Sequence, residues 1–508
     1  MTFSGHAYLA LNDDPYLWDF LVHGENRTLI MSYPLSTLAV RLYEIFPDIQ
    51  WFSWIMVGGG VILNYFFAVY ITSLGAKSVR WLMAAILTLA DLFLWYHFSI
   101  TLLTMFLAVF SFVFLPRREA MFWGGLVTAT LLRDEIVFGV MPLFLTAYLF
   151  LSDRTGWNPG RIATVVLALG TLAAIHYSPR LDTEYSKWLT YHEARVYFTD
   201  LGGKDLKGVL RGDEKTFVRS WYNQDEELIS SEKVVKAAGS HLDVVLTRLS
   251  HPVLRRIAGR IYHHKMILVL LFCTGLLVYW RAMGKVDTAL LLVFVTGFFI
   301  LIYVRDAPRV TFPLLFLWLI MLMRHMESRL KEKHLKLILG AVFVTLLIDL
   351  PLHGEHRKED LMLRDEAVQL MKKHPEYIRY EPAITFPRAY NGYIGTAMTQ
   401  NRLFDEKEWI ANYILPAGWI SRHPYFYASH HISTKNKKRK FKNYYEFLTD
   451  RNTAFIGSKE INDEFNTEIL KMMDRLHPKG RNCRHVVKII DESEHFSIVR
   501  VLPECGKE

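Results

Sequence analysis

Long apolar segments follow one another through the first 350 residues of the chain and constrain its fold more than any other feature. We place ten candidate membrane spans, at roughly 51–73, 81–97, 99–115, 120–132, 135–151, 162–177, 265–281, 286–304, 310–324 and 335–350. Several are shorter than the ~20 residues that a helix needs to cross about 30 Å of hydrocarbon, so their ends are approximate. The sequence predicts a polytopic α-helical membrane protein with about 10–11 spans.

The composition places the chain between a soluble protein and a pure membrane bundle. Of its 508 residues 51% are apolar and 14% aromatic, so soluble parts are expected beside the spans. The net charge of +9 does not indicate nucleic-acid binding, because much of the excess lies in short loops between apolar segments. No Walker loop, GxGxxG after a strand, HExxH or GxSxG occurs, so nucleotide, dinucleotide, zincin and hydrolase-elbow sites lack support.

The segment 120–151 is either one long helix or two short ones that break at Arg133-Asp134-Glu135. With two helices, all the basic loops fall on one side, which the positive-inside rule makes cytoplasmic. With one, the most basic loop would face outward, and a charged triplet in mid-helix would cost several kcal/mol. The sequence therefore predicts two helices. The basic loops carry Lys77, Arg80, Arg117, Arg118, Arg154, Arg161, Arg281, Lys285, Arg324, Arg329, Lys331, Lys333 and Lys336.

This orientation divides the chain into a bundle, 1–350, and an extracytoplasmic α/β domain, 351–508. The segments expected on the outer face are 12–50, 133–135, 178–264, 305–309 and 351–508. Only eleven residues precede Asn12, so the amino terminus would begin outside; a shortened gene model that lost a first span is one explanation. Residues 28–46 have helical apolar spacing and are expected to lie along the outer interface.

The tail after residue 350 has the pattern of a small α/β domain. We expect a strand at Thr453–Gly457, a helix at 459–476 and a hairpin around a polar turn at Asp491–Glu494. Cys483 and Cys505 flank this hairpin, so antiparallel pairing would bring them together. The sequence predicts a disulfide between them, conditional on an oxidising, extracytoplasmic location.

The motif Asn12-Asp13-Asp14 comes where the chain enters the first outer loop. A carboxylate of Asp13 or Asp14 can act as a general base, or can ligate a divalent cation such as Mg or Mn that grips a phosphate. The alternative is a helix N-cap, since Pro15 follows at a favourable first helical position. The two interpretations are compatible, because Asp13 could cap while Asp14 reacts.

Two arginines bracket a short outer turn between apolar helices. Arg305 and Arg309 carry guanidinium groups that bind phosphate oxygens bidentately, which suits a lipid-linked phosphate at the membrane surface. The alternatives are that Arg305 pairs with Asp306 and both snorkel, or that the arginines pair with acids of the first loop.

Arg133-Asp134-Glu135 offers a further phosphate-binding arginine and a second acid, or an ion pair that stabilises a helix break. Asp91 lies within an apolar segment, where an acid is functional by default unless it hydrogen-bonds a neighbouring helix. His176 sits at a predicted interface, where amphipathic rings are common, and it receives little weight as a site residue.

With these motifs the chain resembles the GT-C superfamily of polytopic membrane glycosyltransferases, and more narrowly a poorly characterised bacterial group within it. The residues that carry the resemblance are Asn12-Asp13-Asp14, Gly24, Tyr33-Pro34, Leu42-Tyr43, Pro47, Trp51, Arg309-Val310 and Pro313. They cover the bundle from about residue 12 to residue 350 and are short, and the expected first span is missing.

The resemblance implies sugar transfer from a polyprenyl-phosphate-linked donor to an envelope glycan, lipid or protein acceptor, at the outer face of a bacterial cell membrane. By the resemblance Asp13 or Asp14 would be the base, and the arginines would hold the lipid phosphate. A polysaccharide polymerase or ligase is the alternative among enzymes, although a first-loop acid favours the transferase. A lipid-linked saccharide transporter or flippase is the alternative of another class, although the charges gather at one surface rather than at mid-bilayer.

Overall fold

A computed structural model of the chain describes residues 24–96, 99–115, 118–152, 158–199, 207–210, 214–219, 229–238, 265–304, 308–349, 449–459 and 483–505, with short strands and isolated positions elsewhere. The chain divides into two compact units. The helical unit contains Met1–Tyr8, Asn26–Ser178 and Thr247–Leu352. The mixed unit contains Leu9–Glu25, Pro179–Leu246 and His353–Glu508, so residues 179–246 group with the tail.

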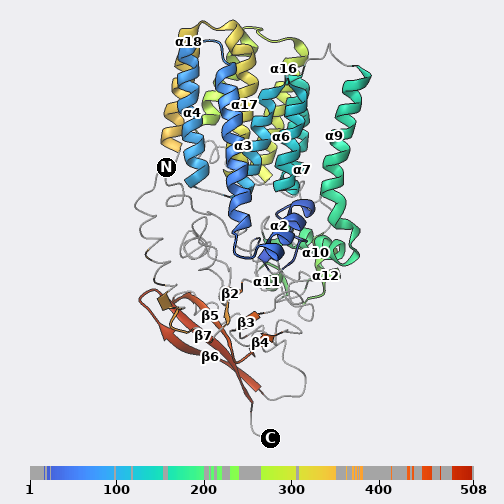
Figure 1. Cartoon of the computed structure of the whole chain (residues 1–508), viewed down its shortest axis with the longest axis vertical. Coiled ribbons are helices and arrows are strands. Elements are labelled where there is room, and N and C mark those ends of the chain that lie inside the picture. Colours follow the sequence, from blue (N-terminus) through green and yellow to red (C-terminus); the bar gives the residue numbers. More distant parts are fainter. Residues whose placement is uncertain are drawn as a thin grey trace. The chain divides into compact units, whose positions relative to one another are not determined.

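The helical unit is a bundle in which the long helices stand side by side (Figure 1). Its described helices are α2 (Tyr33–Ile45), α3 (Trp51–Ser73), α4 (Lys77–Tyr96), α5 (Ile100–Ser111), α6 (Glu119–Leu132), α7 (Asp134–Gly139), α8 (Met141–Leu151), α9 (Pro159–Tyr177), α15 (Met266–Tyr279), α16 (Lys285–Val304), α17 (Pro308–Arg329) and α18 (Glu332–Asp349). Each predicted span coincides with a helix, and 135–151 forms two, α7 and α8. The expected interfacial segment 28–46 contains α2.

Five stretches of helix in the described part are long and apolar enough to cross a membrane, and they correspond to α3, α4, α9, α16 and α17. The shorter apolar helices include α6, α8 and α15. The chain is therefore mostly helical with several candidate spans, as expected of a membrane protein.

The chain reverses direction at Arg133, so the predicted helix break there is confirmed, whereas the second predicted helix is divided into α7 and α8. Arg133 has an extended backbone, with φ −151° and ψ 94°, between α6 and α7. The hydroxyl of Tyr148, near the end of α8, donates to the carboxylate of Glu119 at the start of α6. The rings of Phe122 and Tyr148 lie 5.5 Å apart. The start of α6 and the end of α8 therefore lie together, as in a helical hairpin.

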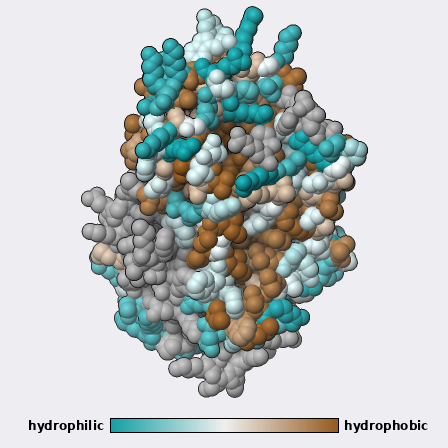
Figure 2. Space-filling view, turned by 45° about the horizontal axis from the view of Figure 1, so that its top comes forward, coloured by the Kyte–Doolittle hydropathy of each residue, from teal (hydrophilic) through white to brown (hydrophobic). Residues whose placement is uncertain are grey.

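The loops with basic residues meet at one end of the bundle, which we call the basic end. There Arg161 Nε lies 2.9 Å from Glu119 Oε2, and Arg324 Nη1 donates to the carbonyl of Phe150 at 3.1 Å. The amide of Gly75, between α3 and α4, donates to Glu327 Oε1 at 2.7 Å. Hydrophilic side chains also gather at the top of Figure 2. These contacts agree with the predicted alternation of loops.

The centre of the bundle is apolar and closely packed around α5 and α17. Every residue of α5 is buried. Phe106 contacts Phe312 and Phe316 of α17, with ring centroids 6.0 and 5.8 Å apart. Phe110, one turn further along α5 than Phe106, contacts Phe316, one turn further along α17 than Phe312, at 5.9 Å. The two helices therefore run in the same direction. Glycine permits the close approach of α3 to its neighbours: a Cβ at Gly59 would lie 2.7 Å from a methyl of Leu103.

The mixed unit contains a sheet and a group of helices. The helices in its described part include α10 (Thr183–Thr199), α11 (Glu214–Arg219) and α12 (Ser231–Ala238). The strands are β1 (Ile378–Tyr380), β2 (Tyr413–Ile414), β3 (Ile432–Thr434), β4 (Lys437–Arg439), β5 (Thr453–Ser458), β6 (Cys483–Glu492) and β7 (Phe496–Cys505). A sheet of order β2-β1-β5-β7-β6 has β1 parallel to β2 and β5, and β7 antiparallel to its neighbours. The predicted strand at 453–457 is confirmed; most of the predicted helix 459–476 lies outside the described residues.

The β6–β7 hairpin places Cys483 directly opposite Cys505 in the register. Opposed residues of antiparallel strands have Cα atoms about 4.5–5.5 Å apart, within the range that a disulfide spans. The backbone therefore fits the predicted bond, although both side chains lie outside those described. We expect denatured, unreduced protein to show one free thiol, that of the buried Cys273. Thiol titration that finds three would contradict the bond.

Two histidines join the segment 366–376 to the hairpin. His374 Nε2 lies 3.0 Å from Asp491 Oδ2, and His495 Nδ1 lies 2.7 Å from Glu366 Oε2. Hydrogen bonding from His374 is the largest cause that holds the pKa of Asp491 below its ordinary value. Burial alone would raise the pKa of Glu366, but hydrogen bonds from Ser493 and His495 outweigh it, so that pKa is lowered too.

This pair of contacts predicts that the hairpin loosens in acid. A carboxylate whose pKa is lower when folded stabilises the fold above its ordinary pKa, about 4.5 for Glu366, and loses that contribution as pH falls further. The amide of His495, which donates to Glu366 at 2.8 Å, should therefore lose hydrogen-exchange protection below about pH 4.5. The amide of Val499, in the middle of β7, is the internal control. Equal pH dependence of the two amides would contradict the prediction.

Candidate functional site

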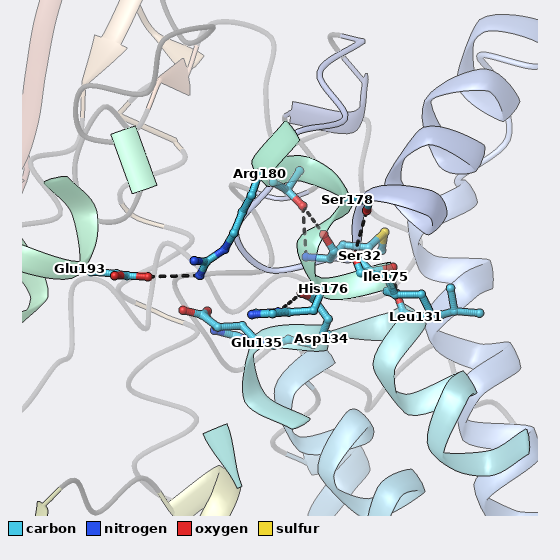
Figure 3. Close-up of polar contacts among 12 residues, drawn as sticks. Ser32, Leu131, Asp134, Glu135, Ile175, His176, Ser178, Arg180 and Glu193 are labelled. Atoms are coloured by element: carbon cyan, nitrogen blue, oxygen red, sulfur yellow. Dashed lines mark hydrogen bonds and ion pairs between the residues drawn. The ribbon is translucent and has the colours of Figure 1, made fainter. Parts of the chain in front are cut away.

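A group of polar side chains lies in the helical unit where α6 turns into α7. We call it the Arg133 cluster, and it consists of Thr101, Arg133, Asp134, Glu135 and His176 (Figure 3 shows part of it). Thr101 is at the start of α5 and His176 near the end of α9. Because α6 runs from the basic end to Arg133, the cluster lies at the opposite end of the bundle.

Arg133 lies at the break between α6 and α7, and its side chain contacts neighbouring residues. Only 8% of the residue is exposed, and its Nη1 donates to the hydroxyl of Thr101. Its Nη2 lies 3.9 Å from Glu135 Oε2. A buried guanidinium needs such partners, since an unpaired buried charge is costly. These contacts favour the ion pair at a helix break over a guanidinium that is open to a phosphate, two interpretations that the sequence left equal.

Asp134 and His176 form a close pair between α7 and α9. Asp134 Oδ2 lies 2.7 Å from His176 Nδ1, and both side chains are 13% exposed. The imidazole stacks on Phe138, with ring centroids 4.3 Å apart and an interplanar angle of 15°. Among the described residues, Nε2 of His176 has no hydrogen-bond partner. A carboxylate on Nδ1 fixes the proton there and leaves the Nε2 lone pair to accept another.

Helix α2 covers this end of the bundle next to the cluster. The hydroxyl of Ser32, at the N-cap of α2, donates to the carbonyl of Leu131 at 2.6 Å, two residues before Arg133 (Figure 3). The last carbonyls of a helix have no partner within the helix, so this bond satisfies one of them. It also fixes the start of α2 against the turn that positions Asp134.

The structure describes only some of the other predicted site residues. Asp13, Asp14 and Arg305 lie outside the described residues. Arg309 is half-buried in the first turn of α17. Because α17 and α5 begin at the same end of the bundle, Arg309 lies at the same end as Thr101 of the cluster.

Asp91 belongs to a different contact, between α3 and α4. Its Oδ1 accepts from Asn64 Nδ2 at 3.4 Å and from Trp95 Nε1 at 3.1 Å. This is the bond to a neighbouring helix that the sequence left open as the alternative to a second acid. Asp91 has no bond to the Arg133 cluster among the described residues.

The sequence reasoning missed His176 as a partner of Asp134. The signal was available, because Asp134 begins one apolar segment and His176 ends the next, so an antiparallel pair places them at the same end. The packing of α7 against α9 then brings the two side chains into contact.

The described part of the chain has no group of three His, Cys, Asp or Glu side chains that could hold a metal ion. Asp13 and Asp14, the predicted cation ligands, lie outside that part, so Mg or Mn binding stays a prediction. No family model, curated protein or solved structure matches the chain.

Proposed function

We propose that the protein is a GT-C-type membrane glycosyltransferase that moves a sugar from a polyprenyl-phosphate-linked donor to an envelope glycan, lipid or protein. The observation that carries the proposal is the Asp134–His176 pair beside a buried arginine, at the end of the bundle opposite the basic loops. Polar and ionisable groups that are buried in a protein are costly unless they serve a function or satisfy one another. Here His176 Nε2 is left to act on a ligand.

The distribution of charge supports an extracytoplasmic position for this site. The described basic residues at the basic end are Lys77, Arg80, Arg118, Arg161, Arg281, Lys285, Arg324, Arg329, Lys331, Lys333 and Lys336. The positive-inside rule makes that end cytoplasmic, so the Arg133 cluster faces outward in a bacterial cell membrane. Donors with a polyprenyl chain present their phosphate at that level.

The reaction requires a base, a phosphate holder and an open acceptor position. The acceptor hydroxyl forms a bond to the anomeric carbon, the bond from that carbon to the donor phosphate breaks, and the hydroxyl proton passes to a base. By resemblance Asp13 or Asp14 is that base, and His176 Nε2 offers a second proton acceptor. Arg309, with Arg305, holds the departing polyprenyl phosphate through charge-assisted hydrogen bonds.

The test is transfer of radiolabelled sugar from polyprenyl-phosphate donors in membranes that contain wild type, Asp13→Asn, Asp14→Asn or His176→Gln at matched expression. We expect loss of transfer in one aspartate variant that still inserts normally. Glu44→Gln is the control, because Glu44 is an exposed acid of α2 paired with Arg41 at 2.6 Å. Full activity in all the variants would disprove the assignment of the base.

The same membranes separate the transferase from the alternatives. A flippase moves the lipid-linked sugar to the outer leaflet without a glycosylated product. A polymerase or ligase extends or joins glycan chains and does not consume a single-sugar donor. Either outcome, with the aspartate variants unaffected, would replace the proposal.

A further inference from the structure

Helices α3 and α4 present polar side chains on the outside of the bundle, away from the ends of both helices. The two helices lie side by side (Figure 1), and Asn64 of α3 bonds to Asp91 of α4 at 3.4 Å. Asn64 is exposed and Asp91 is half-buried. With a rise of about 1.5 Å per residue, Asn64 lies about 14 Å from the basic end of α3 and about 20 Å from its other end. On α4, Asp91 lies about 21 Å from the basic end and about 8 Å from the other end. If α3 and α4 span a membrane, the pair therefore lies within the hydrocarbon, about 14–21 Å from the basic end.

Asn64 and Asp91 have more hydrogen-bond acceptors than the described donors around them can satisfy. The amide hydrogens of Asn64 go to the carbonyl of Gly60 at 3.0 Å and to Asp91 Oδ1. Trp95 Nε1 donates to the same oxygen at 3.1 Å. Asn64 Oδ1 and Asp91 Oδ2 have no hydrogen-bond partner among the described residues, and both are acceptors. The face therefore lacks donors, and hydrocarbon supplies none.

The surroundings leave room for another helix. Val61 and Ala68, one turn on each side of Asn64, are both exposed, and the exposed fraction of Val61 is 64%. On α4 the exposed neighbours of Asp91 are Thr88 and Leu92. Small and apolar side chains around a polar centre are typical of helix–helix interfaces within membranes.

We infer that the α3–α4 face binds a transmembrane helix of a partner protein that carries a lysine or arginine level with Asn64 and Asp91. Such a side chain supplies both the missing donors and the charge that complements the carboxylate. A second copy of this chain is a poorer match, because it would bring the same two acceptors. The inference depends on α3 and α4 spanning the membrane, and not on the proposed glycosyl transfer.

The probe is a synthetic leucine-rich helix of about 20 residues with one central lysine and an adjacent photoreactive residue. It is added to nanodiscs that hold the full-length protein, and crosslinks are mapped by mass spectrometry. We expect at least about ten times more crosslinking to α3 and α4 than with an all-leucine helix. Asp91→Asn, which keeps the size and the acceptor oxygen, should remove most of this excess. Leu92→Ala, at the adjacent exposed position, should preserve it.

Three results would overturn the inference. One is equal crosslinking by the lysine and all-leucine helices. Another is an excess that persists in Asp91→Asn. The third is a dimer that forms without the probe and crosslinks through a photoreactive residue at Val61, which would assign the face to a second copy.

Discussion

Substitution of Gly125 by leucine is expected to cost roughly 3 kcal/mol or more of stability, through overpacking in the centre of the bundle. Gly125 lies on the face of α6 that meets α5 and α3. A Cβ there would lie 2.8 Å from the Cβ of Ser111 and 3.0 Å from the ring of Phe66. The Cβ of Ser111 cannot move without its backbone, and Phe66 is held by a ring contact with Phe114 at 4.9 Å. The helices must therefore separate.

The adjacent glycine is a matched control for this prediction. Gly124 is exposed, and a Cβ there meets nothing within 4 Å. Gly124→Leu adds the same atoms and the same gain in helix propensity without a clash. Thermal unfolding in detergent should show a midpoint at least about 5 °C lower for Gly125→Leu, and little change for Gly124→Leu. Similar midpoints would mean that α5 and α6 pack more loosely than the structure shows.

Charge and apolar length made most of the helical unit predictable. The positive-inside rule decided that the chain reverses at Arg133, and that reversal fixes which helix ends lie together. The span at 51–73 coincides with α3, because its apolar segment is long and uninterrupted. In the tail, alternation of apolar residues around a polar turn predicted the β6–β7 hairpin, with Cys483 opposite Cys505.

The details of the polar contacts could not be read from the sequence. Whether Arg133 binds a ligand or its own neighbours depends on the approach of Thr101, which lies on another helix. The hydrogen-bond partner of Asp91 also lies on another helix, because Asn64 is 27 residues away in the sequence. Local spacing identifies side chains at one end of a helix, but helix packing decides which of them touch. Val140, where α7 ends and α8 begins, also interrupts a segment that reads as one apolar run.

The Asp134–His176 pair should show strong coupling in a double-mutant cycle. The variants are Asp134→Asn, His176→Phe and both together, with stability measured by unfolding in detergent. Phenylalanine keeps the stacking of the ring on Phe138 and removes the nitrogen that contacts Asp134. A hydrogen bond to a charged group is worth about 1.5–3 kcal/mol, so we expect a coupling free energy in that range.

Glu135 provides the control for this cycle and connects it with function. The side chain of Glu135 is 45% exposed, against 13% for Asp134, so solvent screening should make its coupling to His176 weaker than that of Asp134. If Asp134 orients His176 for proton transfer, Asp134→Asn should lower sugar transfer by about 100-fold or more, and Glu135→Gln by only a few-fold. Strong coupling in stability with unchanged transfer would make the pair a structural contact at the helix break. It would leave Asp13 and Asp14 as the remaining candidates for the base.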